Sequence, residues 1–237
     1  MVSQKSIIIL LVVCGALIAL LALWERNINS TPELLLEPAG EGEPLAITSP
    51  LTPEEAAVVD PVITNTMNPT VTFATNQGAI SLEIFADVMP ITAGNFIKLV
   101  EEGFYDGTKF HRVIDGFMIQ GGDPNTKTPD TATYGTGGPG YAIADEHIPG
   151  ENLSNVRGSI SMANSGPNSG GSQFFINLTD NTFLDFDKQP LSSKHPVFGR
   201  VVEGMDVVDA IAKVETSPRD LPLEDVVIES ATVSQGQ

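Results

Sequence analysis

The stretch FHRVIDGFMIQGGD, which begins at Phe110, constrains the fold most, because it contains two short strand patterns separated by a tight-turn signal. Apolar and polar residues alternate in the first strand, and this period of two predicts that Phe110, Arg112 and Ile114 share one face. Asp115-Gly116 supplies the turn into the second strand, FMIQ. An arginine beside apolar residues on a strand face either reaches the rim of the sheet or faces a cleft, and the pattern alone leaves both open.

The region from Thr70 onward continues this pattern of short strands, separated by turns rich in Gly, Asn and Pro. Further strands are predicted at 71–75, 79–85, 159–163, 173–177, 197–202 and 226–233. Two helices are predicted, from Pro90 to about Glu102 and over 204–213, because their apolar residues follow helical spacing. This combination predicts a mainly β fold: a closed, eight-stranded antiparallel barrel capped by two α-helices.

The charge balance and residue usage argue against several classes of function. The chain of 237 residues carries a formal net charge of −18 at pH 7, whereas binding of nucleic-acid phosphates needs clustered Lys and Arg. Nucleic acid is therefore not an expected partner. Cys14 is the only cysteine and the three histidines are scattered, so we expect no metal site and no cofactor.

Three local features have a structural interpretation as well as a functional one. The glycine-rich stretch GTGGPG at Gly135 lacks the Gly-Lys-Ser/Thr ending of a phosphate-binding loop, and a turn is the better interpretation. Asp185 and Asp187 could ligate a cation, but a solvent-exposed pair is the more common arrangement and is what we expect. His111 is expected to be a strand residue with satisfied hydrogen bonds, pointing away from any groove.

The N-terminal region predicts a membrane anchor. Ile7–Trp24 is an uninterrupted apolar run, and about 18 helical residues just reach across a bilayer core of about 30 Å. Lys5 precedes the run, which places the N-terminus in the cytoplasm and the remainder of the chain outside. Residues 1–24 are therefore predicted to be an uncleaved signal-anchor helix. The alternative is secretion after signal cleavage, for which Leu20 is a poor fit to the small residue that a cleavage site requires.

The segment from 25 to 69 differs in composition from both neighbours. It contains repeated prolines and acidic residues and shows no hydrophobic periodicity. Such a segment cannot bury enough apolar surface to offset its ordering entropy, so it is predicted to be a flexible tether. The sequence thus predicts three parts: the anchor at 1–24, the tether at 25–69 and a globular domain at 70–237.

Three motifs of the globular region together resemble the cyclophilin family of peptidyl-prolyl cis-trans isomerases. They are FHRVIDGFMIQGGD, GSISMANSGPNSGGSQFFINL and KHPVFGRVVEGMDVVDAI, in the family's order and close to its spacing. The resemblance extends from Thr70 to about Val233. It implies an eight-stranded barrel with two capping helices, and an enzyme without a cofactor that accelerates rotation about X–Pro bonds in polypeptides.

The resemblance also implies roles for individual residues. Arg112 matches the catalytic arginine of the family. The matches to the family's substrate-binding residues are Phe117, Met118, Gln120, Ala163, Asn164, Gln173, Phe175, Phe183, Leu184 and His195. Phe183 stands where the family often has a tryptophan that contacts cyclosporin-type inhibitors, and this departure argues against tight cyclosporin binding.

The chemistry of X–Pro rotation suits these residue types. The barrier is about 20 kcal/mol because amide resonance must be broken, and no nucleophile or proton relay is required. A site need only prefer the twisted amide to either planar form. Arg112 can donate to the prolyl nitrogen as its lone pair localises, while Phe117, Met118, Phe175 and Leu184 supply an apolar pocket for the ring.

Two hypotheses of different classes follow. The first is a membrane-tethered prolyl isomerase that acts on extracytoplasmic chains as they fold; the second is a non-catalytic peptide-binding module on the same fold. The pocket set around Arg112 favours the enzyme, because a scaffold has no need of the guanidinium. The expected partners are proline-containing polypeptides and, through the N-terminal helix, the membrane. We expect the domain to be monomeric.

Overall fold

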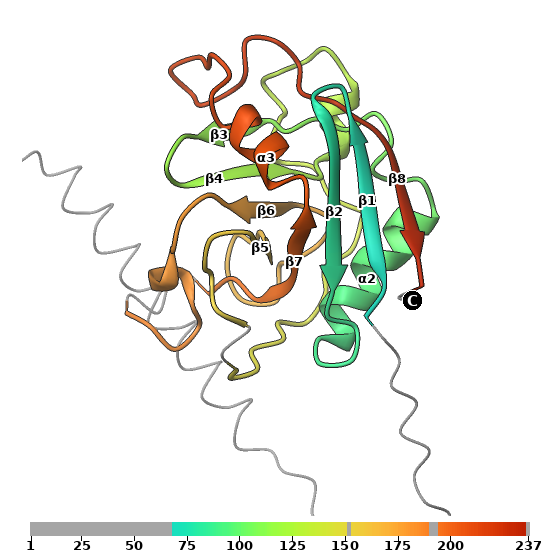
Figure 1. Cartoon of the computed structure of the whole chain (residues 1–237), viewed down its shortest axis with the longest axis vertical. Helices are drawn as coiled ribbons and strands as arrows, with labels where there is room; N and C mark the ends of the chain where they lie inside the picture. The colour runs from blue at the N-terminus through green and yellow to red at the C-terminus, as the bar shows by residue number, and fades with distance from the viewer. Residues whose placement is uncertain (1–67, 151–152, 190–193, 236–237) are drawn as a thin grey trace, which may run out of the picture. The chain divides into compact units, whose positions relative to one another are not determined.

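The strands of this protein form one continuous antiparallel sheet. The computed structural model describes residues 68–150, 153–189 and 194–235. The strands in these ranges are β1 (Thr70–Thr75), β2 (Gly78–Ile84), β3 (Arg112–Ile114), β4 (Met118–Gly121), β5 (Ser159–Met162), β6 (Phe174–Asn177), β7 (Val197–Glu203) and β8 (Ile228–Ser234). Their order in the sheet is β3-β4-β6-β5-β7-β2-β1-β8, with antiparallel pairing throughout (Figure 1).

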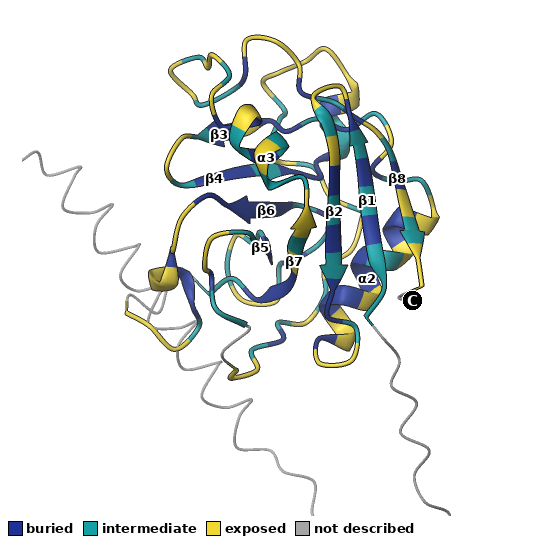
Figure 2. Ribbon diagram, in the orientation of Figure 1, coloured by how far each residue is buried: buried dark blue, intermediate teal, exposed yellow. Residues whose placement is uncertain are grey.

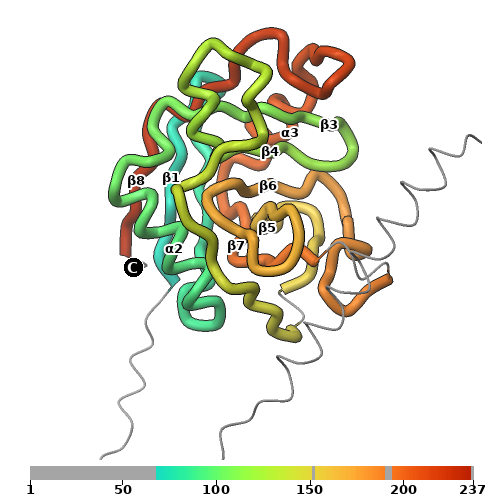
Figure 3. The backbone as a smooth tube through the Cα atoms, turned by 180° about the vertical axis from the view of Figure 1, so that it is seen from behind, coloured from blue at the N-terminus to red at the C-terminus, as the bar shows by residue number. Residues whose placement is uncertain are grey.

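The sheet curls into a half-barrel, and among the described residues its edge strands β3 and β8 do not form a ladder with each other. In Figures 1 and 3, β3, β4 and β6 run across the direction of β1, β2 and β8. Next to the edge strands, a single β-bridge joins Lys109 to Val227. The N–H of Val113 in β3 donates to the carbonyl of Asp220, 2.8 Å away, so a loop occupies part of the edge that β8 would need. The predicted eight antiparallel strands are confirmed, and the described strands form a half-barrel with a bridged seam in place of a fully laddered barrel.

Two α-helices pack on this sheet, close to where the sequence places them. They are α2 (Pro90–Glu101) and α3 (Met205–Ile211), and the 3-10 helices are η1 (Pro124–Lys127) and η3 (Thr182–Leu184). Helix α2 lies against β7 and β8, and α3 lies against β2 (Figures 1 and 3). The buried Glu146 carboxylate accepts hydrogen bonds from the N–H groups of Ile91 and Thr92, at 3.2 and 2.9 Å, and so caps the N-terminus of α2.

Both faces of the sheet are buried around β4, β5 and β6, and each face has its own apolar cluster (Figure 2). Ile119, Phe174 and Met162 point inward to the main core, which lies between the curled sheet and α2. Their neighbours in sequence point outward, as the two-residue period of a strand requires. We call the outward group the outer cluster: Met118, Phe175 and Leu184, with Ile114, Phe117 and Ala163 packed against them.

The alternation predicted around Arg112 is correct only from the start of β3 onward. Phe110 lies in the main core together with Val113, whereas Ile114 packs on the outer cluster. The prediction that Phe110 shares a face with Arg112 and Ile114 is therefore wrong. The physical reason is that regular strand geometry begins at Arg112, so the period of two does not extend back through His111.

The predicted membrane anchor concerns residues that the structure does not describe. Among the described residues, no helix combines the length and the apolar character needed to cross a bilayer. The predicted anchor at 1–24 lies outside the described residues, and so does the predicted tether except for Asn68 and Pro69.

Candidate active site

A row of three residues crosses β3, β4 and β6 on the outer face of the sheet. Arg112 is the ladder partner of Gln120, and Gln120 is the ladder partner of Phe175. Directly opposed residues of an antiparallel pair place their side chains on the same face, about 5 Å apart at Cβ. The sheet register therefore aligns a guanidinium, an amide and an aromatic ring side by side.

The apolar floor beside this row is the outer cluster. Met118 and Phe175 are buried even though they point away from the main core, because they pack with Leu184 of η3 and with the partly buried residues of the outer cluster. The ring of Phe117 stacks on Phe183, with the centroids 6.1 Å apart and the planes 15° apart. Phe183 is 48% exposed and so extends the apolar surface outward from the outer cluster.

His195 packs against the outer cluster as a neutral ring. It meets Phe175 edge to face, with the centroids 5.3 Å apart. Its Nδ1 lies 3.1 Å from the carbonyl oxygen of Met162, and because a carbonyl only accepts, Nδ1 carries the proton. Burial lowers the pKa of His195, while the bond to Met162 opposes this shift. The imidazole therefore adds apolar wall and no positive charge at neutral pH.

The segment after β5 offers backbone groups to a ligand. The N–H of Ala163 donates to the carbonyl of Gln173 at 3.0 Å, and the Asn164 side chain donates to the carbonyl of Lys194 at 2.7 Å. Among the described residues, the carbonyl of Ala163 and both backbone groups of Asn164 have no hydrogen-bond partner. An extended peptide that lies along this segment can pair with them as an added strand would.

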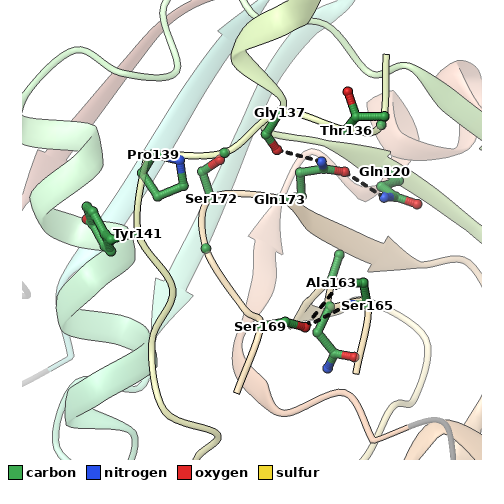
Figure 4. Close-up of a pocket in the computed structure, with 14 residues that line it drawn as sticks. Gln120, Thr136, Gly137, Pro139, Tyr141, Ala163, Ser165, Ser169, Ser172 and Gln173 are labelled. Atoms are coloured by element: carbon green, nitrogen blue, oxygen red, sulfur yellow. Dashed lines mark hydrogen bonds between the residues drawn. The ribbon is translucent and has the colours of Figure 1, made fainter. Parts of the chain in front are cut away.

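A cavity of about 500 Å³ continues from this segment (Figure 4). Four predicted site residues line it: Gln120, Ala163, Asn164 and Gln173. In Figure 4, the side chain of Gln173 lies between Gln120 and Gly137. Its Oε1 accepts a hydrogen bond from Nε2 of Gln120 at 3.0 Å, and its Nε2 donates to the carbonyl of Gly137 at 2.8 Å. None of the described lining residues carries a formal charge at neutral pH, so the cavity suits an uncharged group.

The sequence assigns no role to several residues that line this cavity, among them Thr136, Tyr141, Ser165 and Ser169. The two serines lie within the second motif, so the resemblance covers them without pointing to a function. Tyr141 reaches the site from outside any motif, and its hydroxyl donates to Asn95 on α2 at 2.8 Å. That contact depends on the fold and leaves no local signal in the sequence.

The glycine-rich wall of the cavity is held from beneath by Asp123. This carboxylate is fully buried and accepts hydrogen bonds from the backbone N–H groups of Asn125, Gly135 and Gly137. Two of the amides that a phosphate-binding loop would present to its ligand, those of Gly135 and Gly137, are here bonded to the chain's own carboxylate. The interpretation of GTGGPG as a turn agrees with this arrangement.

Arg112 keeps most of its donors available. Its side chain is 44% exposed, and its Nε lies 3.6 Å from Oδ2 of Asp220. Among the described residues, the guanidinium makes no hydrogen bond of ordinary length. It can therefore donate to a ligand that lies against the outer cluster.

The structure thus brings all eleven predicted site residues onto one surface, although two neighbouring expectations are wrong. His111 is buried, and neither ring nitrogen has a hydrogen-bond partner among the described residues, so it is not satisfied. Of the expected solvent-exposed pair, Asp187 is exposed, but Asp185 is buried and hydrogen-bonded to Asn155. In both cases the side chain is covered by segments that are remote in sequence, and no local pattern reveals such contacts.

In the part of the chain that the structure describes, no group of three or more His, Cys, Asp or Glu residues is arranged to hold a metal ion.

Comparison with known proteins identifies the family. The family described as "Cyclophilin type peptidyl-prolyl cis-trans isomerase/CLD" matches residues 70–233. Peptidyl-prolyl cis-trans isomerase B of Escherichia coli is 46% identical over 173 residues, which cover 70% of this chain and 99% of that protein. Peptidyl-prolyl cis-trans isomerase CYP18-1 of Arabidopsis thaliana is 45% identical over 164 residues, which cover 69% of this chain and 94% of the relative.

Solved structures agree with the sequence relatives. A cyclophilin type peptidyl-prolyl cis-trans isomerase of Cryptosporidium parvum matches with a TM-score of 0.61 at 29% identity, covering 72% of this chain and 99% of the other. The same protein crystallised in the presence of the dipeptide Ala-Pro matches with a TM-score of 0.60, covering 70% of this chain and 99% of the other. The chain therefore belongs to the cyclophilin-type peptidyl-prolyl cis-trans isomerase family and is an enzyme of that class.

Proposed function

We propose that this isomerase acts by holding a proline ring in the outer cluster while Arg112 stabilises the twisted X–Pro amide. The observation that carries the proposal is the cross-strand row of Arg112, Gln120 and Phe175, which sets a guanidinium beside the buried apolar residues of the outer cluster. We call the outer cluster together with His195 the proposed proline pocket. A non-catalytic peptide-binding module would gain from the pocket but not from this charge.

The catalytic step follows from the electronic structure of the amide. Rotation breaks the resonance and localises a lone pair on the prolyl nitrogen, at a cost of about 20 kcal/mol in water. The Nη groups of Arg112 donate to that nitrogen most strongly when the amide is twisted. The interaction therefore lowers the barrier more than it stabilises either planar ground state, which is the requirement for catalysis.

The substrate is a proline-containing polypeptide in an extended conformation. The free backbone groups of Ala163 and Asn164 support this proposal, because they can pair with the chain that precedes the proline. The apolar walls at Phe117 and His195 suit the proline ring. The relative from Cryptosporidium parvum was crystallised in the presence of the dipeptide Ala-Pro, which supports the same class of ligand.

Isomerisation of a short peptide tests this function. The purified full-length chain is added to a tetrapeptide with a central Ala-Pro bond, and cis–trans exchange is followed by NMR. We expect exchange to accelerate and an excess of a second Pro-containing peptide to slow it by competition, whereas the same competitor with Ala in place of Pro has little effect. Exchange at the uncatalysed rate, or equal competition by both peptides, would contradict the proposal.

We also propose that the catalytic domain lies outside the cytoplasm, attached to the membrane by the apolar run Ile7–Trp24. The single Lys5 before the run supports this orientation. The test is protease treatment of intact spheroplasts: we expect the domain to be cleaved from outside. Full protection, with cleavage only after lysis, would contradict the orientation. Recovery of the intact domain in the medium would instead favour secretion after signal cleavage.

A further inference from the structure

A buried polar network lies directly beneath the proline pocket. Asp185 is only 7% exposed, yet its carboxylate has three hydrogen-bond donors. Ser154 Oγ lies 2.6 Å from Oδ2, while the backbone N–H and the Nδ2 of Asn155 lie 2.7 and 2.9 Å from Oδ1. A buried carboxylate is costly unless it is satisfied in this way. Asn155 supplies two of the three donors.

The side chain of Asn155 is fully buried and uses both ends of its amide. Besides Asp185, its Nδ2 donates to the carbonyl of His195 at 3.1 Å. Its Oδ1 accepts from Oγ of Ser161 at 2.7 Å and from Nδ2 of Asn177 at 3.3 Å. One amide therefore joins two loops to two strands of the sheet.

Two of these contacts fix one side of the proline pocket. Asp185 directly follows Leu184, and the N–H of His195 donates to the carbonyl of Leu184 at 3.1 Å. Because Asn155 bonds both to the Asp185 carboxylate and to the His195 carbonyl, it fixes the spacing of the chain segments that carry these two walls.

The other contacts fix the floor and the opposite wall. Ser161 is the ladder partner of Phe175, so its bond to Asn155 ties the network to the outer face of the sheet. The backbone carbonyl of Asn155 accepts from the N–H of Asn181 at 2.7 Å. The Nδ2 of Asn181 donates in turn to the carbonyl of Phe117 at 2.9 Å.

We infer that Asn155 is a positioning residue of the isomerase: it sets the distances between the pocket walls at Phe117, Phe175, Leu184 and His195 without touching the substrate. Asn155 does not line the cavity and does not belong to the outer cluster. This inference rests on the proposed function, because it assigns a role to the geometry of the proline pocket. The side chain of Asn155 connects to three of these walls and its backbone carbonyl, through Asn181, to the fourth. Such a residue acts on catalysis through the relative placement of the walls, and a displacement of about 1 Å can lower the rate strongly.

The first test compares Asn155→Ala with the control Ser154→Ala in the full-length chain. Asn155→Ala removes the side-chain bonds to Asp185, His195 and Ser161 and keeps the backbone bonds to Asp185 and Asn181. We expect kcat/KM for a proline tetrapeptide to fall by about tenfold or more. Ser154→Ala also removes one hydrogen bond to Asp185 but leaves the bonds of Asn155 intact, and we expect kcat/KM to stay within about twofold of wild type. Circular dichroism and thermal unfolding show whether each variant is folded at the assay temperature.

The second test uses Asn155→Asp, which keeps the shape of the side chain. Its carboxylate would lie within hydrogen-bond distance of the Asp185 carboxylate, and two such groups cannot both ionise without strong repulsion. We expect kcat/KM to be low at pH 8 and to recover toward pH 5, where one carboxyl group is protonated and donates to the other. Wild type is measured over the same range, because His195 also contacts the network and titrates in both proteins.

The outcomes separate the two proposals. Folded Asn155→Ala with wild-type kcat/KM, or the same loss in Ser154→Ala, overturns the inference while the isomerase mechanism stands. If Asn155→Ala does not fold, a flat pH profile for folded Asn155→Asp overturns the inference. A wild-type chain with no isomerase activity overturns the proposed function, and the role of Asn155 with it.

Discussion

The Nε of Arg112 lies 3.6 Å from Oδ2 of Asp220, and both side chains are nearly half exposed. This ion pair is long and hydrated, a class of pair that contributes at most about 1 kcal/mol. Asp220 therefore neutralises part of the charge without immobilising the guanidinium. Its backbone adopts a left-handed conformation, with φ at +62°, and its carbonyl accepts from Val113 of β3. The loop thus brings an acidic group to the site while it covers the sheet edge.

Asp220→Asn removes this charge and keeps a residue that tolerates the left-handed backbone. We expect kcat/KM to rise, by no more than about fivefold at low salt, and the effect to shrink as salt screens the pair. The control is Asp115→Asn, which removes the same charge from an exposed pair with Lys213 and is expected to leave kcat/KM unchanged. A large loss of activity in Asp220→Asn would show that the pair positions Arg112.

Gly137→Ala is expected to disturb the wall of the cavity. A Cβ at Gly137 would overlap the Asp123 carboxylate and lie 2.9 Å from Cγ of Asn125, so the loop must move outward. We expect a loss of about 1–3 kcal/mol in the free energy of unfolding, as for other overpacked sites, and a raised KM. Gly138→Ala is the matched control, because a Cβ there meets nothing within 4 Å. Denaturant unfolding and peptide kinetics check both, and equal behaviour of the two variants would contradict this account.

His111 is expected to make stability depend on pH. Burial lowers the pKa of His111, the Asp123 carboxylate opposes this shift, and Arg112 adds to it. The folded pKa therefore lies below the unfolded value of about 6.5. Above that value both states are neutral. As pH falls below it, the unfolded chain binds the proton first, so the free energy of unfolding decreases.

Denaturant unfolding of wild type and His111→Leu at pH 7.5 and pH 5 measures this effect. We expect the decrease between the two values to be smaller in the variant. It does not vanish, because burial also lowers the pKa of His195, with the same sign. An identical decrease in both proteins would show that the His111 ring does not resist protonation in the folded state.

The local patterns of the sequence predict the elements well, because their signals are local. The helix predicted to start at Pro90 does start there and ends at Glu101, one residue before the predicted end. The spacing of its apolar residues and the position of its proline are enough to predict this helix. The face of Phe110 is predicted wrongly, since periodicity does not reveal that regular pairing starts only at Arg112.

Local patterns do not predict the site in the same way, because its residues come from separate segments of the chain. Periodicity places Arg112 on a strand face and goes no further; the resemblance to the family supplies the remaining members of the site. The supporting residues follow from neither source. Asn155 and Asp185 are polar residues in loops, typical of solvated surface, and only the fold buries them against each other. Tyr141 enters the cavity wall for the same reason.

The kinetics of Arg112→Ala and Arg112→Lys, with kcat and KM determined separately by NMR exchange, test the central claim most directly. If the guanidinium acts on the twisted amide, we expect Arg112→Ala to lose about 10²-fold in kcat with KM nearly unchanged. Arg112→Lys keeps the charge but not the planar fork, and we expect it to recover only part of kcat. A raised KM with wild-type kcat in Arg112→Ala would contradict the account, because Arg112 would then bind the substrate without lowering the barrier to rotation.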